Sequence, residues 1–197
     1  MSLGDVPDVS EAEDKERAKW IGVYIGALAV LLAVCSMLGS NSTKDATRAN
    51  IEASNTYAFY QARNIRQLAL RNQAEHLETM LAAFPNLPAE TRKVLNERIK
   101  DHNAVAGRYE SDPKGNDGKK ELLVKARQLE AERDVALRRD PYYDFAQALL
   151  QIAIVLGSVA IITGGSAVLL ASGASAALGL LMLLNGAFLL VRIPGLG

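Results

Sequence analysis

The chain has 197 residues, of which 49% are hydrophobic, and its 22 Lys/Arg residues balance 22 Asp/Glu residues. That average hides a segregation, because residues 20–38 and 145–191 contain no charged side chain. A neutral chain without a concentrated basic stripe excludes nucleic acid as the expected partner. Its single cysteine, Cys35, excludes an internal disulfide.

The N-terminal part divides into a tail and a first apolar segment. Residues 1–19 carry six acidic and three basic side chains and are expected to form an acidic, disordered tail. Residues 20–39 are expected to form transmembrane helix 1, because a helix of about 20 residues crosses the hydrocarbon core. A cleaved signal peptide is the alternative, but its apolar core is usually shorter and Gly39-Ser40 is a weak cleavage site.

Small residues line one face of this first apolar segment. Gly22, Gly26, Ala29 and Ala33 follow each other at spacings of four and three. Small faces allow close approach of helices in lipid, where the hydrophobic effect does not drive their association. These four residues are therefore candidate helix-packing residues.

Residues 40–140 are charged and predict an extramembrane helical hairpin. Its first arm covers about residues 44–83 and ends at the prolines in 84–88, because proline can neither donate to a helix nor continue it. Several of its apolar residues fall near one predicted stripe: Ile51, Ala58, Ile65, Leu68, Leu77 and Leu81.

The second arm covers about residues 89–139 and is broken at 111–118, a segment with the composition of a loop. Two predicted stripes follow helical spacing: Leu95, Ile99, His102, Ala106 and Tyr109, then Leu122, Ala126, Leu129 and Ala136. The first arm would be about 60 Å long and the two halves of the second together about 63 Å. These similar lengths predict that the loop interrupts the second arm without reversing it, with a shorter three-helix bundle as the alternative.

The last apolar stretch is too long for one span. Asp140-Pro141 has the pattern of an N-cap followed by proline at the first helical position, so transmembrane helix 2 is expected at 141–163. Paired glycines predict a tight turn at 164–166, with transmembrane helix 3 at 167–192 and a tail at 193–197. An alternative break lies at 172–175.

Two amides, Gln151 and Asn185, are polar outliers in these spans and are candidate helix-packing residues, because a buried amide usually hydrogen-bonds a neighbouring helix. The sequence thus predicts an all-α membrane protein with three transmembrane helices. A long helical-hairpin stalk, similar to a coiled coil, separates the first from the second.

Aromatic and arginine side chains gather in the first arm. Because such residues are enriched at interface hot spots, they form a candidate interaction patch. Its members are Tyr57, Phe59, Tyr60, Arg63 and Arg66.

Two blocks of sequence resemble domain-of-unknown-function family 4337. The first comprises residues 41–54 and 57–63, and the second comprises residues 129–134, 138–144 and 151–156. The resemblance implies an uncharacterised bacterial membrane protein with the same three-span plan, and it implies no activity. The chain departs from the family at its final turn, where Gly164-Gly165 stands in place of the expected basic residues.

This resemblance implies the bacterial inner membrane as the location. Lys15, Arg17 and Lys19 precede the first span and favour a cytoplasmic N-terminus with a periplasmic stalk. Basic residues on the other side are more numerous, but long loops can cross a membrane regardless of charge.

No catalytic, cofactor-binding or metal site is expected, so the chain is not expected to be an enzyme. His76 and His102 lack a second histidine at helical spacing, and Cys35 is placed in a span where neither can reach it. The glycine-rich stretches lack the lysine of a phosphate-binding loop.

We therefore expect a structural or scaffolding protein that contacts membrane lipid and forms a homo-oligomer. One alternative is an accessory subunit bound to another membrane protein in a larger complex. The other is a passive pore lined by Gln151, Ser158, Thr163 and Asn185.

Overall fold

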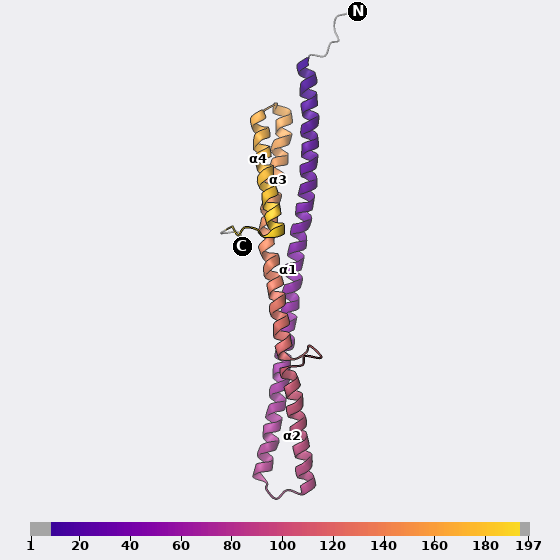
Figure 1. The fold of residues 1–197 in the computed structure, drawn as a ribbon, viewed down its shortest axis with the longest axis vertical. Coiled ribbons are helices and arrows are strands. Elements are labelled where there is room, and N and C mark those ends of the chain that lie inside the picture. Colours follow the sequence, from indigo (N-terminus) through magenta and orange to yellow (C-terminus); the bar gives the residue numbers. More distant parts are fainter. Residues whose placement is uncertain (1–8, 194–197) are drawn as a thin grey trace, which may run out of the picture. The chain divides into compact units, whose positions relative to one another are not determined.

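The computed structural model describes residues 9–193, with side chains from Glu13 onward, and this range contains helices and no strand. Its helices are α1 (Val9–Ala83), α2 (Ala89–Glu110), α3 (Lys119–Thr163) and α4 (Ser166–Phe188), as Figure 1 shows. The predicted all-α class is therefore confirmed for this range. Residues 1–8 of the expected N-terminal tail and 194–197 of the C-terminal tail lie outside it.

The chain divides into two compact units, and each is described separately. We call residues 1–46 with 134–197 the apolar unit, and residues 47–133 the charged unit. Both α1 and α3 contribute residues to each unit.

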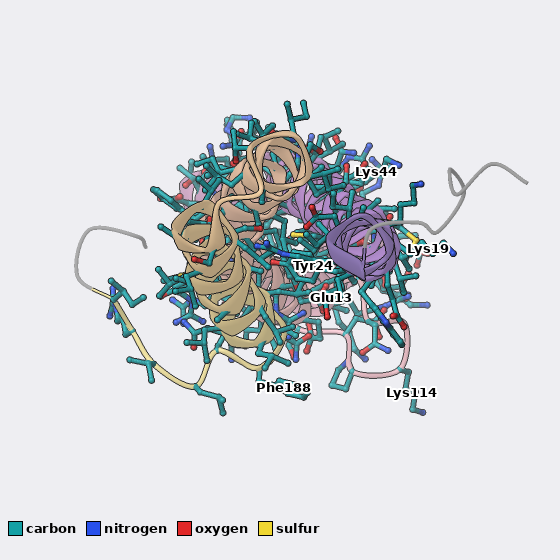
Figure 2. The ribbon with its side chains drawn as sticks, turned by 90° about the horizontal axis from the view of Figure 1, so that it is seen from above. Glu13, Lys19, Tyr24, Lys44, Lys114 and Phe188 are labelled. Atoms are coloured by element: carbon teal, nitrogen blue, oxygen red, sulfur yellow. The ribbon has the colours of Figure 1, made fainter. Side chains whose placement is uncertain are left out.

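In the apolar unit, the beginning of α1 and the end of α3 lie beside α4 (Figure 1). α1, α3 and α4 are each long and apolar enough to cross a membrane. Figure 2 shows Tyr24 directed from α1 toward the other two helices, whereas Lys19 points away from them. One buried cluster joins the three helices: Leu28, Cys35, Tyr143, Ala146, Leu150, Ala153 and Leu183.

The expected disorder of residues 1–19 is wrong from Val9 onward, because α1 begins there. Residues 9–19 contain neither proline nor glycine and are rich in good helix formers. The following span supplies the costly helix nucleus, so these residues need only extend it. Arg17 also donates a hydrogen bond of 2.9 Å to the carbonyl of Gly164, which holds this end of α1 at the α3–α4 turn.

The expected helix start at Asp140-Pro141 is also wrong, because α3 continues through Pro141. An interior proline costs about 3 kcal/mol or more, so surrounding contacts must stabilise the helix. The Ser42 hydroxyl donates to the Ala136 carbonyl at 2.8 Å, and the Cys35 thiol donates to the Tyr143 carbonyl at 3.2 Å. Asp140 accepts a bond from Thr43 of α1 instead of capping a new helix.

In the charged unit, α2 and the first part of α3 pack in succession along α1. Gln67 of α1 bonds Ala106 of α2, and Asn50 bonds Arg133 of α3. Residues later in α2 and α3 therefore contact α1 nearer to the N-terminus of α1. The chain keeps its direction along α1 across the loop at residues 111–118.

The face of α1 that meets α2 and α3 consists mainly of small and polar residues, with leucines toward its end. Its buried and half-buried residues alternate at spacings of four and three, and we call them the inner seam: Ala49, Ala53, Thr56, Tyr60, Arg63, Gln67, Leu70, Ala74, Leu77 and Leu81. The predicted stripe on this arm is corrected, because Leu77 and Leu81 belong to the seam whereas Ile51, Ile65 and Leu68 are more than half exposed. The small alanine side chains bring the helices close, while Ile51, Ile65 and Leu68 stay outside the seam.

Candidate functional site

Gln67 lies at the centre of a polar junction where α2 ends and α3 begins. Its side chain is only 2% exposed. The amide nitrogen donates to the Ala106 carbonyl at 3.0 Å and to the Glu110 carboxylate at 2.9 Å. Its amide oxygen accepts a bond of 2.7 Å from Lys119. One α1 residue thus joins the last turn of α2 to the first turn of α3.

Two cations complete this polar junction. Lys119 lies 3.2 Å from the Glu110 carboxylate and donates to Asn64 at 3.0 Å. Arg63 pairs with Asp117 in the loop, and its guanidinium lies 4.8 Å from the centre of the Tyr109 ring. Both cations already pair with groups of this chain. The junction therefore links the helices and leaves neither cation available for a ligand.

The loop between α2 and α3 is folded against its own helix ends. Glu121 accepts a bond of 2.6 Å from the Ser111 hydroxyl and one of 3.1 Å from the Asp112 backbone. Gly118 is buried, and a Cβ atom there would fall against the Asp112 nitrogen and 2.6 Å from the Ser111 Cα. Glycine at this position is therefore needed for close backbone approach.

Electrostatics favour the charged forms of both loop-bracing glutamates. Hydrogen bonds from Gln67 and Lys119 lower the pKa of Glu110 below its ordinary value. Bonds from the Ser111 hydroxyl and the Asp112 backbone lower the pKa of Glu121 in the same direction. Both carboxylates therefore stabilise the junction as anions.

The candidate interaction patch is divided by the fold. Tyr60 and Arg63 belong to the inner seam, and Tyr57 is half-buried, with its pKa raised by desolvation and by the Glu130 carboxylate on α3. Phe59 is 64% exposed, and Arg66 is also exposed. The five residues therefore do not form a single surface.

A second stripe of apolar and small residues lies on the outside of α1 in the charged unit. It also alternates at spacings of four and three, and we call it the outer stripe: Ile51, Asn55, Ala58, Ala62, Ile65 and Ala69. Ile65 is 67% exposed, and only Ala62 is half-buried. The sequence had indicated Ile51, Ala58 and Ile65 as an apolar stripe, but the helices of this chain leave that stripe uncovered.

The predicted small-residue face of the first span makes no close contact with the described part of the chain. Cβ atoms built on Gly22 and Gly26 would meet nothing within 4 Å, and Ala29 and Ala33 are exposed. Contact of this face with another chain stays a prediction. Close approach within the chain occurs instead at Gly186, where an added Cβ would lie 2.9 Å from the Tyr143 ring.

Hydroxyl groups join the three apolar helices, and none of them was among the candidate residues expected from the sequence. Ser172 of α4 is fully buried and donates to the Ala153 carbonyl of α3 at 2.6 Å. Its oxygen also lies 3.1 Å from the Tyr24 hydroxyl of α1. Ser175 donates to the Leu149 carbonyl at 2.8 Å. Serines at 172 and 175, three residues apart in an apolar helix, were the available signal.

The two candidate amides have different environments. Asn185 is buried, and its side chain bonds both the nitrogen and the carbonyl of Val191 at 2.8 Å. It therefore holds the segment after α4. Gln151 is exposed in the middle of the apolar part of α3 and has no hydrogen-bond partner among residues 9–193.

The segment after α4 is also held by the hydroxyl group of Tyr142, and it forms one wall of a cavity. Leu189 turns the chain in the left-handed conformation, with φ of 51°. The Tyr142 hydroxyl then donates to the Val191 carbonyl at 3.2 Å and accepts a bond of 3.1 Å from the Ile193 nitrogen. The cavity has a volume of about 190 Å³ and is lined by Arg138, Tyr142, Leu189, Val191 and Arg192.

The cysteine and the two histidines belong to different units of the chain. Cys35 is buried in the apolar core, whereas His76 is exposed and His102 is half-buried in the charged unit. Among the described side chains, no three His, Cys, Asp or Glu residues are grouped so that they could hold a metal ion.

These observations define an all-helical protein with three helices able to cross a membrane and a charged helical unit. The family described as domain of unknown function (DUF4337) matches residues 17–189. The chain belongs to this family, as the two sequence blocks had indicated. Comparisons with curated proteins and with solved structures gave no match.

Proposed function

We propose that this chain is a structural or scaffolding protein of the bacterial inner membrane that assembles into a homo-oligomer. The apolar helices of the apolar unit would cross the bilayer three times. The charged unit would form a helical hairpin, similar to a coiled coil, outside it. With the basic flank of α1 on the cytoplasmic side, this hairpin lies in the periplasm.

The outer stripe carries the proposal. An apolar stripe that repeats every seven residues is the pattern by which helices pack along their length. The buried residues of α1 in the charged unit all belong to the inner seam, so the outer stripe on the opposite face is available to pack against another helix. Burying one isoleucine stabilises an assembly by about 1.5–3 kcal/mol, so the two isoleucines on each chain would contribute favourably to such a contact.

A second copy of the chain is the partner that fits this stripe. The stripe contains small residues between its two isoleucines, so two copies can approach closely through the same surface. Such an arrangement is the self-complementary contact of a twofold-symmetric dimer. Gln151 gives independent support, because an amide exposed on an apolar helix is satisfied when it bonds the amide of another copy.

The test is the mass and chain composition of the complex extracted from native membranes into nanodiscs. We expect a multiple of the 21.2 kDa chain mass and no other protein. A monomer under all extraction conditions would contradict the proposal. A complex with a second protein would instead support an accessory subunit, with exposed Phe59 and Arg66 as the first surface to examine.

A matched pair of variants tests the outer stripe itself. Ile65→Gln alters the stripe, whereas Val124→Gln alters an exposed residue of α3 in the same unit. Both side chains are more than half exposed, so neither substitution should unfold the chain. We expect Ile65→Gln to weaken the oligomer and Val124→Gln to leave it unchanged, and the reverse result would place the contact on α3.

A further inference from the structure

The cavity beside the segment after α4 has the chemistry of an anion-binding site. Arg138 of α3 and Arg192 of the segment after α4 both line it. Arg138 is exposed and has no hydrogen-bond or ion-pair partner within the described range of the chain. Guanidinium groups bind phosphate oxygens through paired, charge-assisted hydrogen bonds, so two of them at one cavity favour a phosphate ligand.

The cavity wall is fixed before any ligand binds. Tyr142 is 3% exposed, and its hydroxyl is occupied by Val191 and Ile193. Asn185 holds Val191 from the other side. These bonds fix the backbone that carries Arg192, so little conformational entropy is lost when the site is filled.

The remaining lining is apolar and selects among phosphate compounds. Leu189 and Val191 line the cavity; Leu189 is half-buried, whereas Val191 is 62% exposed. The volume of about 190 Å³ is smaller than the roughly 300 Å³ or more of a typical small-molecule pocket. It therefore suits a phosphate group whose apolar remainder lies outside, along Val191 and the accessible part of Leu189.

The cavity also lies where the sequence changes from charged to apolar. Arg138 precedes the charge-free stretch of residues 145–191, and Arg192 follows it directly. If α3 and α4 cross the bilayer as proposed, both arginines lie at the level of the lipid headgroups. Arginine side chains at that level can pair with the phosphate of an anionic lipid headgroup.

We infer that this cavity binds the headgroup phosphate of an anionic phospholipid, with the acyl chains running over Leu189 and Val191. This inference rests on the proposed membrane insertion of the chain. It does not depend on self-assembly, because every lining residue belongs to one copy of the apolar unit.

The experiment counts retained lipids on the full chain by native mass spectrometry. The chain is loaded from nanodiscs of phosphatidylglycerol or of phosphatidylcholine, with inorganic phosphate as a third arm. The variant Arg138→Gln is compared with Arg127→Gln, which alters an exposed arginine of α3 that does not line the cavity. Circular dichroism of each variant confirms that the helices are intact.

We expect the wild-type chain and Arg127→Gln to retain phosphatidylglycerol in preference to phosphatidylcholine. Arg138→Gln should weaken phosphatidylglycerol binding by about tenfold, because one charge-assisted contact is lost. Equal retention of the two lipids, or an unchanged Arg138→Gln, would overturn the inference. Inorganic phosphate binding as tightly as the lipid would also overturn it, because the apolar wall would then contribute nothing. The same spectra report the number of chains, so a lipid-bound monomer would refute only the self-assembly.

Discussion

Replacing Gln67 with alanine should loosen the charged unit where α2 meets α3. The substitution removes one hydrogen bond to the Ala106 carbonyl and two to the charged groups of Glu110 and Lys119. A neutral bond contributes about 1 kcal/mol and one to a charged group about 1.5–3 kcal/mol. Lys119 and Glu110 keep their mutual contact at 3.2 Å, so part of this energy is retained. We expect a loss of about 2–4 kcal/mol in local stability.

Hydrogen–deuterium exchange of the full chain measures this loss segment by segment. Amides of α2 and of α1 around Gln67 should exchange roughly one to three orders of magnitude faster, following the loss of opening free energy. The matched control is Gln73→Ala, because Gln73 is exposed on the same helix. If these amides exchange at the same rate in the Gln67→Ala and Gln73→Ala variants, Gln67 does not join the two helices.

Three further substitutions or conditions test other parts of the structure. Gly118→Ala should destabilise the loop by about 1–3 kcal/mol in urea unfolding, because its Cβ would meet backbone atoms, whereas Gly173→Ala has open space and should not. Because the folded-state pKa values of Glu110 and Glu121 are lowered, their stabilisation is complete above the unfolded value of about 4.3 and is lost as pH falls below it. Unfolding followed from about pH 6 to pH 3 should therefore show falling stability, with a weaker dependence in Glu121→Gln; an identical dependence would contradict the assignment. Gln151→Leu should weaken the oligomer in nanodiscs by about 3- to 30-fold, because an interhelical amide bond contributes about 0.6–2 kcal/mol; dissociation unchanged from that of Ile152→Leu would show that Gln151 contacts no second copy.

The sequence was sufficient for the family, the helical class and the apolar helices, because charge-free stretches and paired glycines are strong signals. In the second arm, the residues from Leu95 to Tyr109 at spacings of four and three are all buried or half-buried in the structure. Their large side chains made the buried face visible in the pattern.

The first arm was assigned incorrectly because its buried face consists mainly of small and polar residues. Ala49, Ala53 and Ala74 give a weak apolar signal, whereas exposed Ile51 and Ile65 give a strong one. Hydrophobicity alone therefore identifies the outer stripe before the inner seam.

Long-range contacts explain the remaining differences in the apolar unit. Pro141 indicates a helix start from local chemistry, and only packing against α1 and α4 keeps α3 continuous there. The role of Ser172 likewise depends on Ala153 and Tyr24, which lie on other helices. The cavity of Arg138 and Arg192 depends on the fold of the segment after α4, which no local pattern predicts.

The spacing of the inner seam restricts how the length of this protein can change in evolution. Inserting one residue into α1 would rotate all following seam residues by about 100° and would turn alanines outward. Seven inserted residues, by contrast, restore the face after about 10 Å of added helix. The outer stripe has the same seven-residue period, so it survives the same insertion. Relatives should therefore differ in this region by multiples of seven residues, inserted in α1 and in the opposing α2 or α3 together.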